Sequence, residues 1–429
     1  MSLNPTLVER ARAVLRANDR GGYTIPTAGL YPFQWNWDAS VCALGWMTFD
    51  EARAWQEIET LFSGQWTEAD YGGGSAGLLA HITFHQDADS YFPGPDEWGT
   101  QALRIRTSSI SQPPLHATMV RWMWDRAADR AGAEAAVRRL FPKLLAHHRW
   151  WYRTRDPEGS GLVRVLHPWE TGMDNSPAWD RPLAAVPPTT RAYRRRDLDH
   201  VDASMRPPKA FYDRVVYLMD ANREAGFDPV RMARDGRFQV NDIGIVCILQ
   251  RASRDLADMA RVLGEDAAAA ELAGHVACTQ AAVRGLWSER WAQPVSRDLL
   301  TGELLDEPTS AGLLAAYAGF DLDIAPAVGD TLAASPYGIA STRRGASTFD
   351  APRYWRGPVW QHINLLIAQG LAEQGHADLA ERIRTLSARL FEQAGFHEYY
   401  HPETGSGLGG RDFSWTAATY LHWIAADAA

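Results

Sequence analysis

Cysteine is scarce in this sequence. The 429 residues include only three, Cys42, Cys247 and Cys278, an odd number at wide spacing. They do not form the spacing of a redox or metal-binding motif. Cys247 and Cys278 fall on apolar faces of expected helices, which favours packed thiols. The sequence also contains no cluster of metal ligands, and we expect no metal or organic cofactor.

Long apolar runs and excess positive charge are missing too. No run approaches the roughly 18 residues that indicate a membrane span, and residues 1–20 lack the apolar core of a secretory signal. A cytoplasmic protein is therefore the default expectation. The 43 Lys and Arg are outnumbered by 52 Asp and Glu, for a net charge of -9. That balance argues against a nucleic-acid or anionic-membrane partner, although a small anionic substrate responds only to local charge.

Tryptophan, in contrast, is abundant, with 18 residues. Many of them belong in a large core. Trp35, Trp37, Trp169 and Trp355, however, lie in segments without helical periodicity. An indole offers a flat apolar face and one N–H donor, which suits the apolar C–H face and hydroxylated rim of a sugar. These four therefore favour a cleft that binds carbohydrate.

Helical periodicity dominates the chain. The clearest helix begins after the cap Asn241-Asp242 and ends at Gly264, with apolar residues at three-to-four spacing. A long irregular segment, 155–210, is expected to form a lid or rim. This pattern predicts an all-α fold of about a dozen paired helices. The other helices are expected at 3–18, 39–63, 78–82, 114–131, 133–153, 212–225, 266–287, 310–318, 359–373, 377–394 and 413–425.

Two glycine-bearing stretches concentrate carboxylates and aromatic side chains. The first, HPWETGMDNSP at 167–177, reads as an irregular loop, with an Asx turn and helix cap as the plain alternative. The second is EYYHPETGSGLG at 398–409, read as another loop. Asp174 and Glu398 are 224 residues apart, and two such loops could bring an acid and a base to one cleft.

Together with YPFQWNWDAS at 31–40 and RYWRGPVW at 353–360, these stretches resemble glycoside hydrolase family 63. Within it, they are most similar to the bacterial hydrolases of mannosylglycerate and glucosylglycerate. The resemblance implies an (α/α)6 barrel, a toroid of six helix pairs with long loops at one face. It implies a single catalytic domain over 1–429 with 155–210 as a lid insertion. The implied activity is inverting hydrolysis of a small α-glycoside, releasing the sugar and glycerate.

Glycoside hydrolysis needs one carboxyl group to protonate the leaving oxygen and another to activate water. The resemblance implies Asp174 as acid and Glu398 as base, and inversion predicts carboxyl groups about 6.5–9.5 Å apart. Burial beside Trp169 would keep Asp174 protonated near neutral pH. The competing assignments are Glu170 as acid and Glu403 as base. Glu170 could instead fix its loop through backbone N–H groups, and Glu403 resembles an exposed turn residue.

Substrate contacts are also implied by the resemblance. Asp38 would hold sugar hydroxyls while capping a helix that begins near Ala39. Arg206, assisted by Gln112 and Tyr212, would clamp the glycerate carboxylate, with a surface charge as the alternative for Arg206. The remaining expected substrate-binding residues are Tyr31, Trp35, Trp37, Trp169, Tyr354, Trp355 and Trp360. Trp35 and Trp37 would point the same way if their segment were extended.

Several alternatives stay open. The same fold could hydrolyse a neutral α-glucoside or a trehalose-like disaccharide. An α/α-barrel sugar epimerase would need paired histidines, for which the candidates are His81, His85, His116 and His167, none of them in a paired loop motif. The basic run 191–196 favours solvated side chains over substrate contact. Mannose and glucose both stay open for the cleaved sugar, and a homo-oligomer stays open as the assembly.

Overall fold

Helices make up most of the computed structural model, which describes residues 5–70, 74–88, 91–199 and 201–425. An inner set packs side by side: α2 contacts α4, α4 contacts α9, and the contacts continue through α12, α14 and α16 back to α2. The inner helices are α2 (Asn36–Trp46), α4 (His116–Arg126), α9 (Ile243–Leu263), α12 (Ala315–Ala318), α14 (Gln361–Glu373) and α16 (Ser414–Thr419). This closed cycle of contacts confirms the (α/α)6 barrel.

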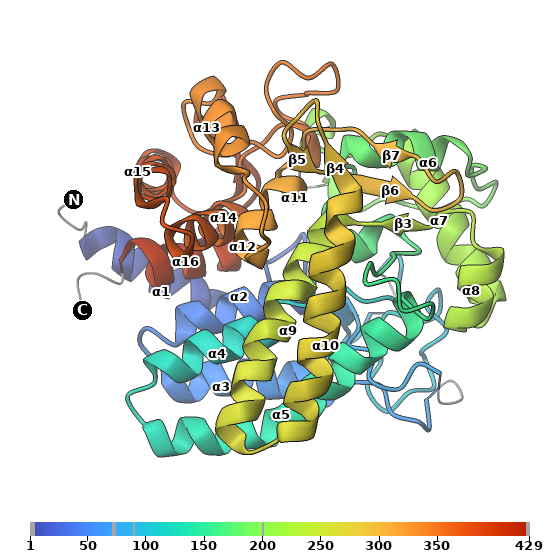
Figure 1. Cartoon of the computed structure of the whole chain (residues 1–429), viewed down its shortest axis with the longest axis horizontal. Helices are drawn as coiled ribbons and strands as arrows, with labels where there is room; N and C mark the ends of the chain where they lie inside the picture. The colour runs from blue at the N-terminus through green and yellow to red at the C-terminus, as the bar shows by residue number, and fades with distance from the viewer. Residues whose placement is uncertain (1–4, 71–73, 89–90, 200, 426–429) are drawn as a thin grey trace.

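A second layer of helices packs outside this ring. Helix α3 contacts α2, α5 contacts α4, α10 contacts α9, and α15 contacts α14. Helix α1 lies beside α16, so the first and last α-helices of the described chain are neighbours (Figure 1). The outer helices are α1 (Pro5–Asn18), α3 (Glu51–Ser63), α5 (Arg130–Arg155), α10 (Asp266–Ala282), α13 (Ala325–Ala334) and α15 (Ala377–Ala394).

Burial separates the two layers. Every residue of the inner helix α2 is buried, because other helices surround it. Such a helix must be apolar or hydrogen-bonded on all sides. Helix α9 begins as expected, with the Asp242 carboxylate accepting from the Ile245 N–H at 2.6 Å. It ends at Gly264, whose φ of 80° suits glycine.

Some helix predictions are wrong. The helix expected at 39–63 is two helices, because Asp50 accepts from the Arg53 N–H and starts α3 after a turn. Residues 78–82 form no helix; instead β2 (Ile82–Thr83) pairs antiparallel with β1 (Gln34–Trp35). The helix expected at 310–318 is divided into α11 (Ser310–Leu313) and α12. Helices α8 (Pro229–Asp235) and α13 were not expected.

Short strands add to the ring without forming a large sheet. The stretch 398–409, expected as a loop, is instead a β-hairpin of β8 (His397–Tyr400) and β9 (Gly407–Arg411). Its Tyr400 also bridges to Val359, just before α14. The remaining strands are β3 (Val240–Asn241), β4 (Trp287–Ser288), β5 (Gln293–Pro294), β6 (Ser296–Asp298) and β7 (Leu304–Leu305). The hairpin therefore carries Glu398 on a paired strand.

The segment 155–210 is largely irregular in its described part, as expected. It contains the 3-10 turns 168–171 and 177–179, the short helix α6 (Asp180–Ala184), and 3-10 turns at 197–199 and 203–205. Helix α7 (Lys209–Glu224) follows it. Over the described ranges, no helix has both the length and the apolar character needed to cross a bilayer.

Candidate active site

One pocket collects most of the expected site residues. Its empty volume is about 960 Å³, which includes open solvent at the mouth. Residues from β1 and α2, the 168–174 turn, the segment before α7 and the β8–β9 hairpin line it together. The lining residues are Pro26, Leu30, Tyr31, Trp35, Trp37, Asp38, His81, Ile82, Tyr91, Phe92, Pro93, Gln112, Trp169, Gly172, Asp174, Arg195, Arg196, Asp197, Arg206, Tyr212, Tyr354, Glu398, Phe413 and Trp415.

Asp174 reaches the pocket from a tightly fixed turn. Gly172 ends the preceding 3-10 helix with φ of 69°, and a Cβ there would lie 2.8 Å from the Trp37 ring. The Trp179 indole N–H then donates to the Met173 carbonyl at 2.9 Å. Burial raises the pKa of Asp174 to about 7; Arg206 opposes the rise and the charge of Glu398 adds to it. This carboxyl group can therefore hold a proton near neutral pH.

Glu170 does not face the pocket. Its Oε2 accepts from the Leu166 N–H at 2.7 Å, and its Oε1 pairs with the buried guanidinium of Arg155. Both oxygens are thus engaged in holding the turn, which is the structural alternative considered from the sequence. Glu403 is exposed and pairs with Arg344 at 2.9 Å.

Glu398 enters the pocket from strand β8 and is 1% exposed. Its Oε1 accepts from the Tyr31 hydroxyl at 3.0 Å, and its Oε2 accepts from the Gly410 N–H at 3.0 Å. Burial raises its pKa above the usual value, while Arg206 and these donors oppose the rise. Donors that stabilise the ionised form suit a carboxylate that must accept a proton from water.

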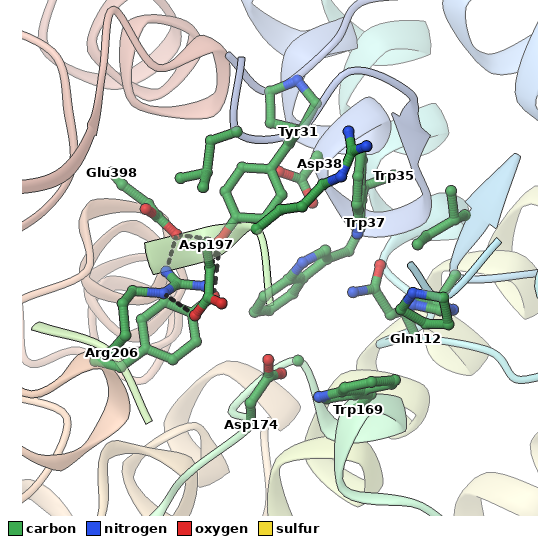
Figure 2. A pocket seen from close by; sticks show the side chains of 18 of the residues that line it. Tyr31, Trp35, Trp37, Asp38, Gln112, Trp169, Asp174, Asp197, Arg206 and Glu398 are labelled. Atoms are coloured by element: carbon green, nitrogen blue, oxygen red, sulfur yellow. Dashed lines mark hydrogen bonds and ion pairs between the residues drawn. The ribbon is translucent and has the colours of Figure 1, made fainter. Parts of the chain in front are cut away.

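The two carboxyl groups face one cavity from different sides (Figure 2). The two groups also interact electrostatically, since the charge of Glu398 contributes to the raised pKa of Asp174. Environments that separate the protonation of two carboxyl groups are the usual basis for an acid and base pair.

Asp38 is a third carboxyl group on the pocket wall. It lies in the first turn of α2 and not at the cap, because the helix begins at Asn36 after Trp35. The capping prediction for Asp38 is therefore wrong. Burial, then the charges of Glu398 and Asp174, raise the pKa of Asp38 well above its usual value.

Trp35 and Trp37 both line the pocket, but not through an extended segment. Trp35 is in strand β1, and Trp37 is already in helix α2. The two indoles therefore reach the pocket across a strand-to-helix turn. The extended segment on which their common direction was predicted to depend is absent.

Arg206 is a pocket residue and not a surface charge. Its side chain is 3% exposed, and its Nη1 lies 3.5 Å from Glu398 Oε1. Its Nη2 donates to the Tyr31 hydroxyl at 2.9 Å, and its guanidinium lies over the Tyr354 ring at 4.1 Å. One positive charge thus stands beside the buried carboxylate of Glu398.

The basic run 191–196 is only partly solvated. Arg194 is 80% exposed, but Arg195 is 8% exposed and pairs with Asp197. Both Arg195 and Arg196 line the pocket. The prediction of solvated side chains is therefore wrong for Arg195. Asp197 was missed, and its place directly after three arginines was the only signal for an ion pair.

Two expected aromatic residues lie behind the wall. Trp355 and Trp360 stack on each other, with ring centroids 3.9 Å apart and an interplanar angle of 3°. Neither lines the pocket. Trp37, which does line it, lies beside Trp355 with ring centroids 6.0 Å apart. The other expected residues do line the pocket: Tyr31, Gln112, Trp169, Tyr212 and Tyr354.

The histidines give no acid and base pair. Only His81 of the four candidates lines the cavity, and burial lowers its pKa well below the usual value. His167 binds the Val215 carbonyl with Nε2, and burial lowers its pKa to about 4. His85 and His116 also lie outside the pocket lining. In the part of the chain that the structure describes, no group of three or more His, Cys, Asp or Glu could hold a metal ion.

Comparison with known proteins gives matches over nearly the whole chain. A family model described as "Mannosylglycerate hydrolase MGH1-like glycoside hydrolase domain" matches residues 31–416. The chain is 44% identical to a mannosylglycerate hydrolase of Thermus thermophilus, over 96% of this chain and 99% of the relative. It is 34% identical to a glucosylglycerate hydrolase of Mycolicibacterium hassiacum, over 99% of both. The crystal structure of a family 63 mannosylglycerate hydrolase from Thermus thermophilus with Tris superposes with a TM-score of 0.92 at 43% identity, covering 97% of this chain and 100% of that one.

Proposed function

Since the chain belongs to the mannosylglycerate hydrolase-like glycoside hydrolases of family 63, we propose that it cleaves mannosylglycerate or glucosylglycerate to the free sugar and glycerate. The observation that carries this substrate class is one buried guanidinium, Arg206, in a pocket with two opposed carboxyl groups. A glycosidase of neutral sugars has no need of that charge, whereas a glycerate leaving group carries a carboxylate.

In the proposed reaction, Asp174 is the general acid. Its raised pKa lets it donate a proton to the glycosidic oxygen as the bond to glycerate breaks. Glu398 is the general base and takes a proton from a water that attacks the anomeric carbon from the opposite face. One displacement of this kind inverts the α-anomer to the β-anomer. The expected separation of the two carboxyl groups is about 6.5–9.5 Å, enough for that water.

The pocket divides into two proposed subsites. Asp38, Trp35 and Trp37 would bind the sugar, with Asp38 hydrogen-bonding to its hydroxyls and the indoles covering its apolar face. Arg206 would bind the glycerate carboxylate, and Gln112, whose Oε1 has no hydrogen-bond partner, would bind a hydroxyl. Tyr31 is assigned to Glu398, to which its hydroxyl donates.

A substrate panel tests the proposal. Purified enzyme is given mannosylglycerate, glucosylglycerate, methyl α-mannoside, methyl α-glucoside and trehalose, and NMR follows the products from the first minutes. We expect kcat/KM to be highest for a glycerate glycoside and the β-sugar to appear first. A preference for trehalose or a methyl glycoside would refute the substrate, and first release of the α-sugar would refute the mechanism. The cytoplasmic location stays a prediction, which cell fractionation tests.

A further inference from the structure

Asp197 joins two arginines at the wall of the pocket. Arg195 binds it with two hydrogen bonds, Nε to Oδ1 at 3.0 Å and Nη2 to Oδ2 at 2.6 Å. Arg206 Nε donates to the same Oδ2 at 3.2 Å, as does the Tyr212 hydroxyl at 3.2 Å. The side chain of Asp197 is 10% exposed. This mostly covered carboxylate thus connects three side chains at the edge of the pocket, and Figure 2 shows it beside Arg206.

These contacts decide which donors of Arg206 remain for a ligand. Its Nε is occupied by Asp197 and its Nη2 donates to Tyr31. Its Nη1 is buried and makes no hydrogen bond, with the Glu398 carboxylate at 3.5 Å. Asp197 therefore fixes the rotation of the planar guanidinium and leaves Nη1 as the nitrogen without a hydrogen bond.

Arg195 supplies the counter-charge. Its guanidinium lies 3.7 Å from the centre of the Tyr212 ring, and its Nη1 donates to the Pro207 carbonyl at 2.8 Å. Burial alone would raise the pKa of Asp197, but Arg195 and Arg206 outweigh it and hold that pKa below its usual range. Because Arg195 forms paired hydrogen bonds with Asp197, that carboxylate has a second counter-charge besides Arg206.

We propose that Asp197 is a positioning residue that aims Arg206 at the carboxylate of the leaving group, with Arg195 as its counter-ion. The inference rests on the proposed function, since it needs an anionic leaving group. It also changes the role expected for Tyr212, because the single hydrogen-bond donor of its hydroxyl is already engaged with Asp197. Tyr212 then supports the cluster and does not donate to the substrate carboxylate.

The test compares Asp197→Asn, Arg195→Gln and a matched control, Asp213→Asn. Asp213 binds the Tyr193 hydroxyl at 2.7 Å and Lys209 at 2.6 Å, so its replacement loosens the same segment without touching Arg206. For each variant, KM and kcat are measured with the preferred glycerate glycoside and with the methyl glycoside of the same sugar. Inhibition by free D-glycerate and by glycerol is measured alongside.

We expect Asp197→Asn and Arg195→Gln each to raise KM for the glycerate glycoside and Ki for glycerate about tenfold or more, the size of one charge-assisted hydrogen bond. Values for the methyl glycoside and for glycerol should change less than about threefold, and Asp213→Asn should resemble the wild type. Circular dichroism and melting curves establish that each variant folds. If one of Asp197→Asn and Arg195→Gln does not fold, the other alone carries the test.

Equal losses on charged and neutral substrates would overturn the inference, because a merely structural role predicts them. Unchanged KM and Ki in Asp197→Asn would overturn it as well. A fall in both would show that Asp197 competes with the substrate and does not position Arg206. If the wild type shows no preference for glycerate glycosides, the proposed function fails and the inference fails with it. A preference that survives in Asp197→Asn refutes the inference alone.

Discussion

Replacing Asp174 with asparagine is the perturbation with the most informative outcome. The proposed acid loses its proton, so turnover of a glycerate glycoside should fall by about 10²–10⁴-fold. The same change removes a carboxyl group whose burial raises its pKa to about 7. Stability should therefore change in a direction opposite to activity, and with a defined dependence on pH.

The sign follows from proton binding. A carboxyl group with a pKa of 3.8 in the unfolded chain and about 7 in the folded chain binds more protons in the folded state between these values. Wild-type stability is therefore lost as the pH rises from about 4 to about 7. Asparagine has no such slope, so Asp174→Asn should match the wild type near pH 4 and exceed its stability above pH 7.

The magnitude follows from the same shift. About three pKa units at 1.36 kcal/mol each give an upper bound of about 4 kcal/mol. Asp174 is partly exposed at the pocket wall, so about 2–4 kcal/mol is the expected gain. For 429 residues, an unfolding entropy of about 2.1 cal/mol/K per residue converts this to a rise in Tm of about 2–4 °C.

Differential scanning calorimetry of both proteins at several pH values between 4 and 8 measures the difference in Tm. The pH dependence of wild-type kcat/KM gives the matching kinetic observation, since its alkaline limb should lie near pH 7. At pH 6 a carboxyl group with a pKa of about 7 is about nine-tenths protonated, against below about one per cent at the usual pKa. A Tm difference that does not vary with pH, or near wild-type turnover in the variant, would refute the assignment of Asp174.

Three further variants test the rest of the site. Glu398→Gln should lower kcat by about 10²–10⁴-fold while the protein still melts cooperatively, and retained turnover would remove Glu398 as the base. Tyr31→Phe deletes a donor 3.0 Å from Glu398 Oε1, so the pKa of Glu398 should rise and the acidic limb of kcat/KM should move to higher pH; an unmoved limb would contradict this. Gly172→Ala should lower kcat and destabilise the fold by about 1–3 kcal/mol. The residue has φ of 69°, and an added Cβ would lie 2.8 Å from the Trp37 ring. Its control is Gly159→Ala, at φ of 66° with no atom within 4 Å, which should lower Tm but leave kcat unchanged.

The sequence predicts the frame of this fold better than its details. Helix α9 is predicted correctly because its cap, apolar face and terminal glycine agree. Helices α11 and α12 are short, and their boundaries depend on packing in the fold, which no local pattern records. The β8–β9 hairpin was expected as a loop, because three of the five residues of β9 are glycine, a residue that is depleted in strands. A strand that exists through its partners leaves a weak local signal.

The candidate site shows the same division. Asp174, Glu398 and Arg206 were identified by their place in long motifs that resemble a known family, and all three line one pocket. Trp355 lies in an equally recognisable motif, but it stacks on Trp360 and does not line the pocket. A motif therefore predicts which residues matter to the site, and packing decides whether they reach the cavity. Asp197 belongs to no such motif, and its role is visible only once Arg195 and Arg206 meet it.

The charges of the pocket give a reason for its unusual number of acids. Four carboxyl groups line it: Asp38, Asp174, Asp197 and Glu398. Ionised carboxylates on the wall would repel the carboxylate of a substrate. Burial raises the pKa of Asp38 and brings that of Asp174 to about 7, whereas Arg195 and Arg206 hold the pKa of Asp197 below its usual range. In the proposed reaction, the burial that keeps Asp174 protonated therefore also weakens the repulsion of an anionic leaving group, so acid catalysis and substrate charge depend on one property of the pocket.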